Sequence, residues 1–387
     1  MTSPIELARQ LAQAFATRAD EADRLGRLPP EDVQALKESG YLTLSVPREY
    51  GGQGLSLREC LAAHLELSQG SASTALVAGM QMHIFGHARE TQPWPETWFE
   101  RFCRAAVNDG ALFNFVASEP TLGSPSRGGL FETCAESTPD GWVINGRKTW
   151  TTGGRHLTHL LVSLTIENDP ALMLVLHDTP GVEWVETWGD ALSLRASDSH
   201  DVYFRNACVP HSHLIQRGAE DAPPNAWFPM VVAAVYLGTA IAARNALIQY
   251  ALERVPTALG KPIATLPKIQ RQIGEIDVAL QAARALLFEV AGEWTGRDHR
   301  QQFPRVVAAK HVATETAIDV TDRALRAAGG LSLTRALPLE RYFRDVRAGL
   351  MHPPSGDTAL EIVGQKAVEK RTLKPEANET SLPKQAR

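Results

Sequence analysis

The hydrophobic residues of this chain change their spacing twice. Over residues 1–110, and again from 225 to about 369, they recur every three to four positions, which is typical of amphipathic helices. From 111 to about 215 they form short runs that alternate or are rich in aromatic and β-branched residues, which is typical of strands. This order predicts an α+β multidomain fold with an N-terminal all-α domain, a central antiparallel β-sandwich or barrel and a C-terminal four-helix bundle.

The 387 residues allow two or three domains. We place them at 1–110, 111–222 and 223–371, and we expect a disordered tail over 372–387 because that stretch is polar and has no apolar periodicity. Helices are expected near 230–255, 267–295, 304–328 and 336–350, with a short helix from about 357.

Three short signals predict local structure. Pro30 followed by acidic residues predicts a helix start, with Gly40 near its end. Ser56 and Glu59 have the spacing of a capping box. Asn145-Gly146 lies between two short β-like runs and predicts a hairpin turn.

One stretch is apolar enough to test as a membrane span. Residues 225–243 carry no charge, but Pro229 interrupts them and only 14 residues remain from 230 to 243. That length is too short to cross about 30 Å of hydrocarbon, so we expect a fully buried bundle helix and no membrane span. The N-terminus has no signal-peptide pattern and the four cysteines form no CxxC pair, which favours a soluble cytoplasmic protein.

Composition excludes several function classes. The 39 basic and 44 acidic residues are not clustered, so no nucleic-acid partner is expected. No nucleotide-binding glycine loop, zinc-protease helix or hydrolase nucleophile motif is present. His83 and His87 are four residues apart, but without a third ligand we expect no metal site.

Four segments, in order, resemble the acyl-CoA dehydrogenase family of flavoproteins, and the resemblance covers roughly residues 5–370. Residues 46–54 (VPREYGGQG) are similar to the family's VPEEYGGxG. Residues 117–124 (ASEPTLGS) and 145–152 (NGRKTWTT) are close to xTEPxxGS and NGxKxWIT. The other matches are LRAS at 194–197, YALER at 250–254, GGLS at 329–332 and LERYFRD at 339–345.

The resemblance implies a flavin, FAD or alternatively FMN, between the β domain and the bundle. It implies that Trp150 stacks on the ring and Thr152 bonds near its reactive nitrogen. It also implies a homotetramer or homodimer, in which one subunit helps to hold its neighbour's FAD. The implied cofactor-binding residues are Val116, Ala117, Ser118, Trp150, Thr152, Arg254, Gly329 and Gly330, and the implied substrate-binding residues are Gly123 and Ser124. For Trp150 the alternative is a core tryptophan and for Arg254 a solvated cation. For Gly329 and Gly330 it is a plain helix cap, and for Gly123 and Ser124 a loop that only shapes the β domain.

The chain departs from the family where most members carry a catalytic Glu. The aligned position is Pro353, which supplies neither a carboxylate nor a backbone N–H. The second known base position also lacks a carboxylate, since Phe228-Pro229 stands there. The remaining candidate acids or bases are Asp357, for which the alternative is a helix N-cap, and His352 and His83.

Residues 350–353 (LMHP) also resemble the LHDP segment of dibenzothiophene monooxygenase-type members, which need a histidine near a reduced flavin. Three readings therefore stay open. The first is α,β-dehydrogenation of an acyl-CoA thioester by a displaced base, with an electron acceptor that the sequence does not identify. The second is a flavin-dependent monooxygenase or oxidase, and the third is a flavoprotein without catalysis that acts as a binding partner.

Overall fold

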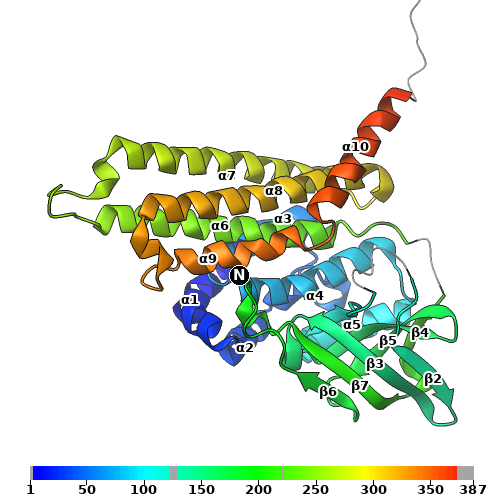
Figure 1. The fold of residues 1–387 in the computed structure, drawn as a ribbon. Helices are drawn as coiled ribbons and strands as arrows, with labels where there is room; N and C mark the ends of the chain where they lie inside the picture. The colour runs from blue at the N-terminus through cyan, green and yellow to red at the C-terminus, as the bar shows by residue number, and fades with distance from the viewer. Residues whose placement is uncertain (1–2, 123–128, 219–221, 373–387) are drawn as a thin grey trace, which may run out of the picture.

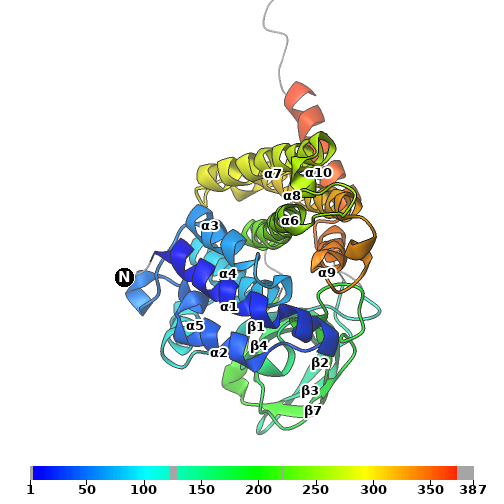
Figure 2. The same cartoon turned by 90° about the vertical axis from the view of Figure 1, so that its left-hand side faces the viewer.

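Helices and strands occupy separate parts of the molecule (Figure 1). The structure is a computed structural model, and it describes residues 3–122, 129–218 and 222–372. A bundle of long helices lies along one side and the sheet lies on the other. In Figure 2 the N-terminal helices lie between the bundle and the sheet. The three parts predicted from the hydrophobic spacing are therefore confirmed as separate layers.

The N-terminal part is helical, as expected. Its α-helices are α1 (Pro4–Leu25), α2 (Pro30–Glu38), α3 (Leu57–Leu67), α4 (Ala72–Thr91) and α5 (Glu96–Asn108). The helix start at Pro30 is confirmed, and Gly40 follows the end of α2 with a φ of 71°. The capping box is also confirmed, because Ser56 Oγ accepts a bond from the Glu59 N–H while the Glu59 carboxylate accepts one from the Ser56 N–H.

The central part is one sheet. Its path runs β6-β7-β3-β2-β4-β5-β8, and β1 pairs with β4 beside that path. The pairings are antiparallel, as predicted, except for β1 with β4 and β2 with β4, which are parallel. The strands are β1 (Phe113–Val116), β2 (Cys134–Thr138), β3 (Gly141–Thr151), β4 (His159–Ile166), β5 (Asp169–Leu176), β6 (Val182–Val185), β7 (His200–Val209) and β8 (Leu214–Arg217).

The hairpin predicted at Asn145-Gly146 is wrong. Both residues lie inside the continuous strand β3. The turn that joins β2 to β3 lies between Thr138 and Gly141 instead. The glycine is needed for close packing, since a Cβ at Gly146 would lie 2.5 Å from the Cα of Thr133. The register of β3 against β7 also shifts at this point, so the pair of residues marks a bulge.

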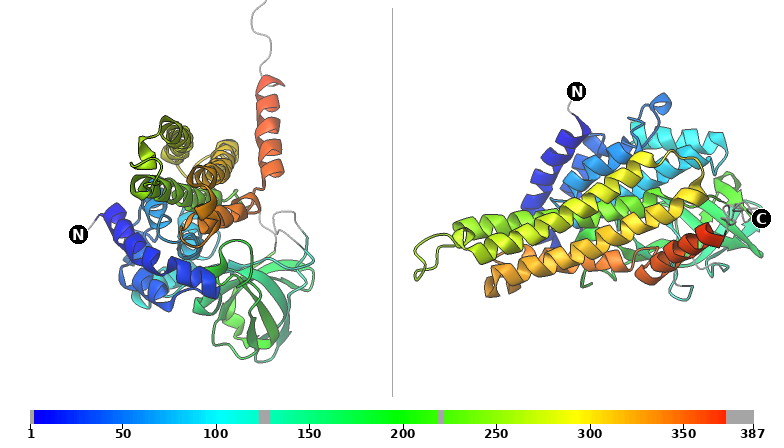
Figure 3. Two further views of the ribbon diagram at one scale, coloured as in Figure 1. Left: turned by 60° about the vertical axis from the view of Figure 1, so that its left-hand side comes forward. Right: turned by 90° about the horizontal axis from the view of Figure 1, so that it is seen from above.

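The C-terminal part contains the bundle. Its α-helices are α6 (Trp227–Glu253), α7 (Pro267–Glu293), α8 (His299–Ala328), α9 (Leu339–Asp345) and α10 (Gly356–Thr372). The helix predicted over 336–350 is shorter than expected, because after Asp345 the chain tightens into a 3-10 segment, Val346–Leu350. Seen from above, α6, α7 and α8 run side by side, and the start of α10 packs on α8 (Figure 3).

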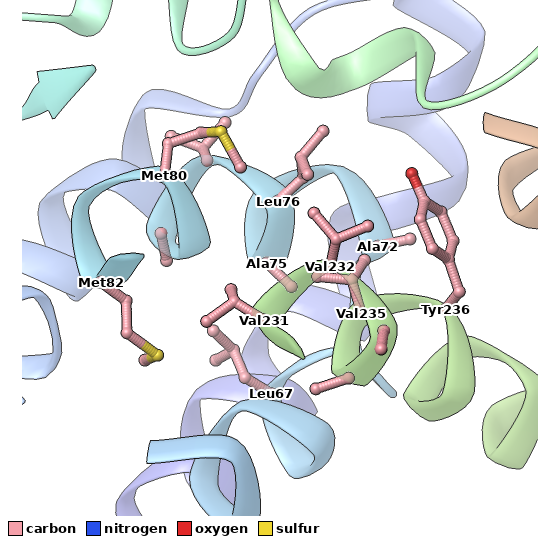
Figure 4. Packing of buried hydrophobic residues seen from close by; sticks show 14 of the residues in the cluster. Leu67, Ala72, Ala75, Leu76, Met80, Met82, Val231, Val232, Val235 and Tyr236 are labelled. Atoms are coloured by element: carbon pink, nitrogen blue, oxygen red, sulfur yellow. The ribbon is translucent and has the colours of Figure 1, made fainter. Parts of the chain in front are cut away.

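Helix α6 forms the centre of the molecule. Among the described helices it alone has the length and hydropathy of a membrane span, but 72% of its most apolar window is buried inside the protein. It packs on α4, where a Cβ at Gly86 would lie 2.2 Å from the Trp227 ring. Figure 4 shows side chains of the two helices packed together with Leu67 of α3, and Tyr236 at the edge of the group. The sequence-based expectation of a buried bundle helix is confirmed.

The end of α9, within the LERYFRD segment, contacts both the N-terminal helices and the sheet domain. Arg344 makes two bonds to the Asp23 carboxylate on α1 and one to the carbonyl of Leu192 in the segment before β7. The neighbouring Asp345 accepts a bond from the Leu194 N–H through its carboxylate. Burial raises the pKa of this carboxyl to about 6. These residues join the helices to the sheet.

Candidate active site

The ends of β1 and β3 bring the expected flavin-edge residues together. The Thr149 N–H donates to the Ser118 carbonyl at 2.9 Å, and Asn114 on β1 donates to the Thr152 carbonyl at 2.9 Å. Val116 is buried, whereas Ala117 and Ser118 are partly open. The two motifs that are about 30 residues apart in sequence therefore form one edge.

Trp150 is the exposed member of this edge. Its side chain is 57% exposed, so the alternative of a core tryptophan is excluded. Its φ of 56° is rare for a bulky residue, and such strain concentrates at functional sites. Two backbone hydrogen bonds hold this segment in place. The Thr149 N–H donates to the Ser118 carbonyl, and the Thr152 N–H donates to the Trp150 carbonyl. The result is a fixed aromatic surface open to a flat ligand.

Thr152 is buried, and its hydroxyl already has a protein partner. Its Oγ1 lies 2.9 Å from Ser199 Oγ, which lies 2.7 Å from Ser197 Oγ. The Gly153 N–H donates to the Ser197 carbonyl. This hydroxyl chain fixes the end of β3 against the segment that follows the LRAS motif.

A buried ion pair supports the same edge from inside the sheet. Lys148 Nζ lies 2.7 Å from Glu119 Oε1, and the carboxylate also accepts bonds from the N–H groups of Glu132 and Thr133. Burial works to raise the pKa of Glu119, but these hydrogen bonds outweigh it and leave the pKa lowered. Burial lowers the pKa of Lys148 to about 8 although Glu119 opposes the change.

Two of the three candidate acid-base residues meet at Phe228. His83 on α4 packs edge-on against the Phe228 ring at 5.1 Å between centroids, and His352 packs edge-on against it at 6.1 Å. The His83 ring also stacks on Phe115 of β1 at 6.2 Å. Burial lowers the pKa of His83 to about 3 and that of His352 to about 4. Both imidazoles are therefore neutral near pH 7.

The third candidate, Asp357, lies apart from this pair. It is exposed and lies inside the first turn of α10, which begins at Gly356, so it is not the helix N-cap of the alternative. Pro353 precedes a second proline, so neither Pro353 nor Pro354 has a backbone N–H to offer. Among the described residues, no group of three His, Cys, Asp or Glu side chains could hold a metal ion.

Two residues next to His352 were not predicted. Tyr236 Oη lies 2.8 Å from His352 Nδ1, and Lys310 donates to the carbonyls of Gly349, His352 and Pro354 at 2.8, 2.9 and 3.0 Å. A usable signal existed for Lys310, because it interrupts the apolar stripe of α8 between Val306 and Ala313. Tyr236 gave a weaker signal as a hydroxyl inside the uncharged run.

Other predicted residues lie elsewhere. Arg254 is exposed at the end of α6, and Gly329 and Gly330 are exposed at the end of α8, with open space beside each glycine. These positions are at the far end of the bundle from α10 (Figure 1). Gly123 and Ser124 lie outside the described residues.

Comparison with known proteins identifies the family. Models of the N-terminal, middle and C-terminal domains of acyl-CoA dehydrogenase match residues 5–92, 114–207 and 230–354. The chain is 37% identical to the putative acyl-CoA dehydrogenase YdbM of Bacillus subtilis over 365 residues, which cover 93% of this chain and 95% of that protein. The chain belongs to the acyl-CoA dehydrogenase family. It is also 28% identical to the mouse mitochondrial short-chain specific acyl-CoA dehydrogenase, over 88% of this chain and 84% of that protein.

Solved structures of the same fold include oxygen-using members. The complex of TdsC from Paenibacillus sp. A11-2 with FMN and indole matches with a TM-score of 0.84 and 26% identity, over 96% of this chain and 98% of that chain. TdsC is a dibenzothiophene monooxygenase. This acyl-CoA dehydrogenase family chain is thus a flavin oxidoreductase, with FAD as the family's cofactor and FMN in the TdsC structure.

Proposed function

We propose that this family member is a flavin-dependent monooxygenase acting on a small molecule. The observation that carries the proposal is the replacement of the family's catalytic carboxylate. Pro353 stands at its position, while His352 and His83 both pack edge-on against the Phe228 ring. Neutral imidazoles next to an aromatic ring suit hydrogen bonding and proton exchange with an oxygenated substrate better than removal of a weakly acidic C–H proton.

The strained, exposed Trp150 fits a flat cofactor ring. We assign the flavin to the edge formed by Val116, Ala117, Ser118, Trp150 and Thr152, where the indole would add apolar contact area. A reduced flavin held at this edge would supply the two electrons that, with two protons, reduce one atom of O₂ to water while the other enters the substrate. His352 and His83 would orient the substrate and hold or return a proton, and Phe228 would separate them.

Family membership supports an assembly as well. Arg254, Gly329 and Gly330 are exposed at one end of the bundle, so they are available to the cofactor of a second subunit. We propose a homodimer or homotetramer in which that contact completes the site. The four free cysteines are compatible with the cytoplasmic location that we propose.

The second candidate is α,β-dehydrogenation of an acyl-CoA, which would place the protein in fatty-acid metabolism. The named relatives favour it, at 37% and 28% identity. It requires a displaced base, and Asp357 is the carboxylate nearest in sequence to Pro353. Gly123 and Ser124 would then contact the CoA portion.

One experiment separates the two candidates. The protein loaded with FMN or FAD is titrated anaerobically with a panel of acyl-CoA thioesters, and separately supplied with reduced flavin, ¹⁸O₂ and the probes indole and dibenzothiophene. We expect no bleaching of the flavin band by thioesters, and ¹⁸O in a product detected by mass spectrometry. Bleaching by a thioester, with no labelled product, supports the dehydrogenase instead.

A further inference from the structure

The hydrogen bond between Tyr236 and His352 determines which imidazole nitrogen carries the proton. Tyr236 is fully buried, and His352 Nδ1 is the partner of its hydroxyl at 2.8 Å. If Nδ1 carried the proton, the phenol hydrogen would have no acceptor among the described residues, and a buried unsatisfied donor costs about 1–3 kcal/mol. The phenol therefore donates, Nδ1 accepts, and the single proton of the neutral ring lies on Nε2.

Burial keeps both partners in the required charge state. It raises the pKa of Tyr236 well above the usual value, so the phenol stays protonated. Burial, together with the nearby Lys310 ammonium, lowers the pKa of His352 to about 4, so the ring stays neutral. In the described part of the chain, His352 Nε2 has no protein partner. That N–H is consequently free for a ligand.

Lys310 fixes the backbone that carries this ring. Its ammonium has three N–H donors, and all three are used on the carbonyls of Gly349, His352 and Pro354. Gly349 in turn lies against the Tyr236 ring, since a Cβ there would come within 2.9 Å of it. The loop is thus held on α8 by Lys310 and on α6 by Tyr236.

We propose that Tyr236 and Lys310 are positioning residues that present His352 to the flavin side of the site as a neutral hydrogen-bond donor through Nε2. The inference rests on the proposed flavin site and assigns His352 a defined role there, donation rather than proton removal. Tyr236 sets the tautomer, and Lys310 sets the place of the loop.

The chain contains a second tyrosine–histidine pair, in which the histidine lies on α3. Tyr41 is buried and its hydroxyl lies 3.1 Å from His64 Nδ1, with the rings stacked as in the pair of Tyr236 and His352. His64 Nε2, however, is buried without a partner, next to Gly79. In the pair of Tyr236 and His352, Nε2 is free for a ligand, whereas in the pair of Tyr41 and His64 it is enclosed. Tyr41→Phe is therefore the control for Tyr236→Phe.

The test is ¹⁵N NMR of the histidine rings in the full-length protein, with His352 assigned from His352→Asn. We expect protonated Nε2 and unprotonated Nδ1 in the flavin-free wild type, and a mixture of tautomers at His352 in Tyr236→Phe. Tyr41→Phe should change His64 alone. Addition of FMN or FAD should shift the His352 Nε2 resonance and leave that of His64 unchanged. A proton on Nδ1, an unchanged tautomer in Tyr236→Phe, or no flavin-dependent shift would overturn the proposal.

Kinetics give a second measurement. With reduced flavin and O₂, Tyr236→Phe should lower kcat about five- to tenfold at unchanged KM, the size of one lost hydrogen bond. Lys310→Met should lose the flavin-dependent NMR shift of His352, because the loop that carries this residue is released. If the Lys310→Met protein does not fold, Tyr236→Phe alone tests the proposal. An altered KM with normal kcat in Tyr236→Phe would contradict a positioning role. If the tautomer and flavin shift are as expected but no ¹⁸O enters a product, the monooxygenase assignment fails while the donor role stands.

Discussion

Lys148 and Glu119 join two of the family motifs inside the sheet. The Nζ and Oε1 atoms are 2.7 Å apart, and both side chains are almost completely buried, at 0% and 1% exposure. The pair ties Glu119 of the ASEP segment to β3, the strand that carries Trp150 next to its end at Thr151. An exposed aromatic surface at one end of β3 thus depends on a charge pair in its interior.

Removal of one member of this pair should destabilise the protein strongly. Lys148→Met leaves the Glu119 carboxylate buried without its cation, and we expect a loss of about 3–5 kcal/mol in the free energy of unfolding. The double variant with Glu119→Gln should lose less than the sum of the single changes. Urea unfolding measures all three proteins. Glu183→Gln, which breaks an exposed pair with Arg205, is the control and should cost about 1 kcal/mol or less. Equal losses of unfolding free energy in Lys148→Met and Glu183→Gln would contradict the view that the buried pair is the more important one.

Trp150→Ala should separate cofactor binding from stability. The Trp150 side chain is exposed and its backbone is strained, so replacing the indole by a methyl group should leave the unfolding midpoint almost unchanged. Loss of stacking on the flavin should weaken flavin binding by about 1 kcal/mol, or about fivefold in Kd. Equilibrium titration with FMN and FAD, followed by fluorescence, gives the constant. Wild-type affinity in this variant would remove Trp150 from the flavin edge.

Acid should destabilise the fold. Burial lowers the pKa of His64 and His83 to about 3, and that of His87, His159 and His352 to about 4, from 6.5. A histidine with a lowered native pKa stabilises the fold above pH 6.5, and this stability is lost as the pH falls toward 4, because the unfolded chain binds more protons.

Two carboxyls act in the opposite direction. Asp198 and Asp345 have pKa values raised by burial to about 6, so they favour the fold as the pH falls through 6. Each histidine contributes up to about 1.4 kcal/mol per pH unit, so five histidines outweigh two carboxyls. We expect Tm to fall steadily between pH 6.5 and 4.5 at constant ionic strength. A Tm that rises over this interval would show that the carboxyls dominate.

Asp357→Asn and His352→Gln test the two candidate reactions by opposite outcomes. In the proposed monooxygenase, Asp357→Asn should keep kcat within about twofold because the side chain is exposed on α10. His352→Gln should lower kcat by about tenfold, since it removes the imidazole that donates through Nε2 and a lost hydrogen bond of about 1.4 kcal/mol corresponds to that factor. Steady-state oxygen consumption coupled to product analysis measures both. The reverse pattern would support the displaced base.

The sequence predicted what depends on local pattern. The three parts, the start of α2 and the capping box at Ser56 follow from spacing and are confirmed. The hairpin at Asn145-Gly146 failed because the glycine serves a contact with Thr133, which lies on another segment. The same limit applies to the site. His83 and His352 could be named from motifs, whereas Tyr236 is 116 positions from its partner and becomes visible only when α6 meets the loop.

Three short strands carry little sequence signal of their own. β2, β6 and β8 are four or five residues long, and each includes polar or charged residues. Backbone pairing with β3, β7 and β5, respectively, holds these three segments as strands.

The fastening of Arg344 to Asp23 and to the Leu192 carbonyl has a practical meaning for engineering. A chimera that takes the sheet from one relative and the helices from another cuts through this three-way connection. Such a hybrid would need the donor's 192–194 segment, Asp23 and the end of α9 transferred as one block, whatever linkers were chosen at the domain borders.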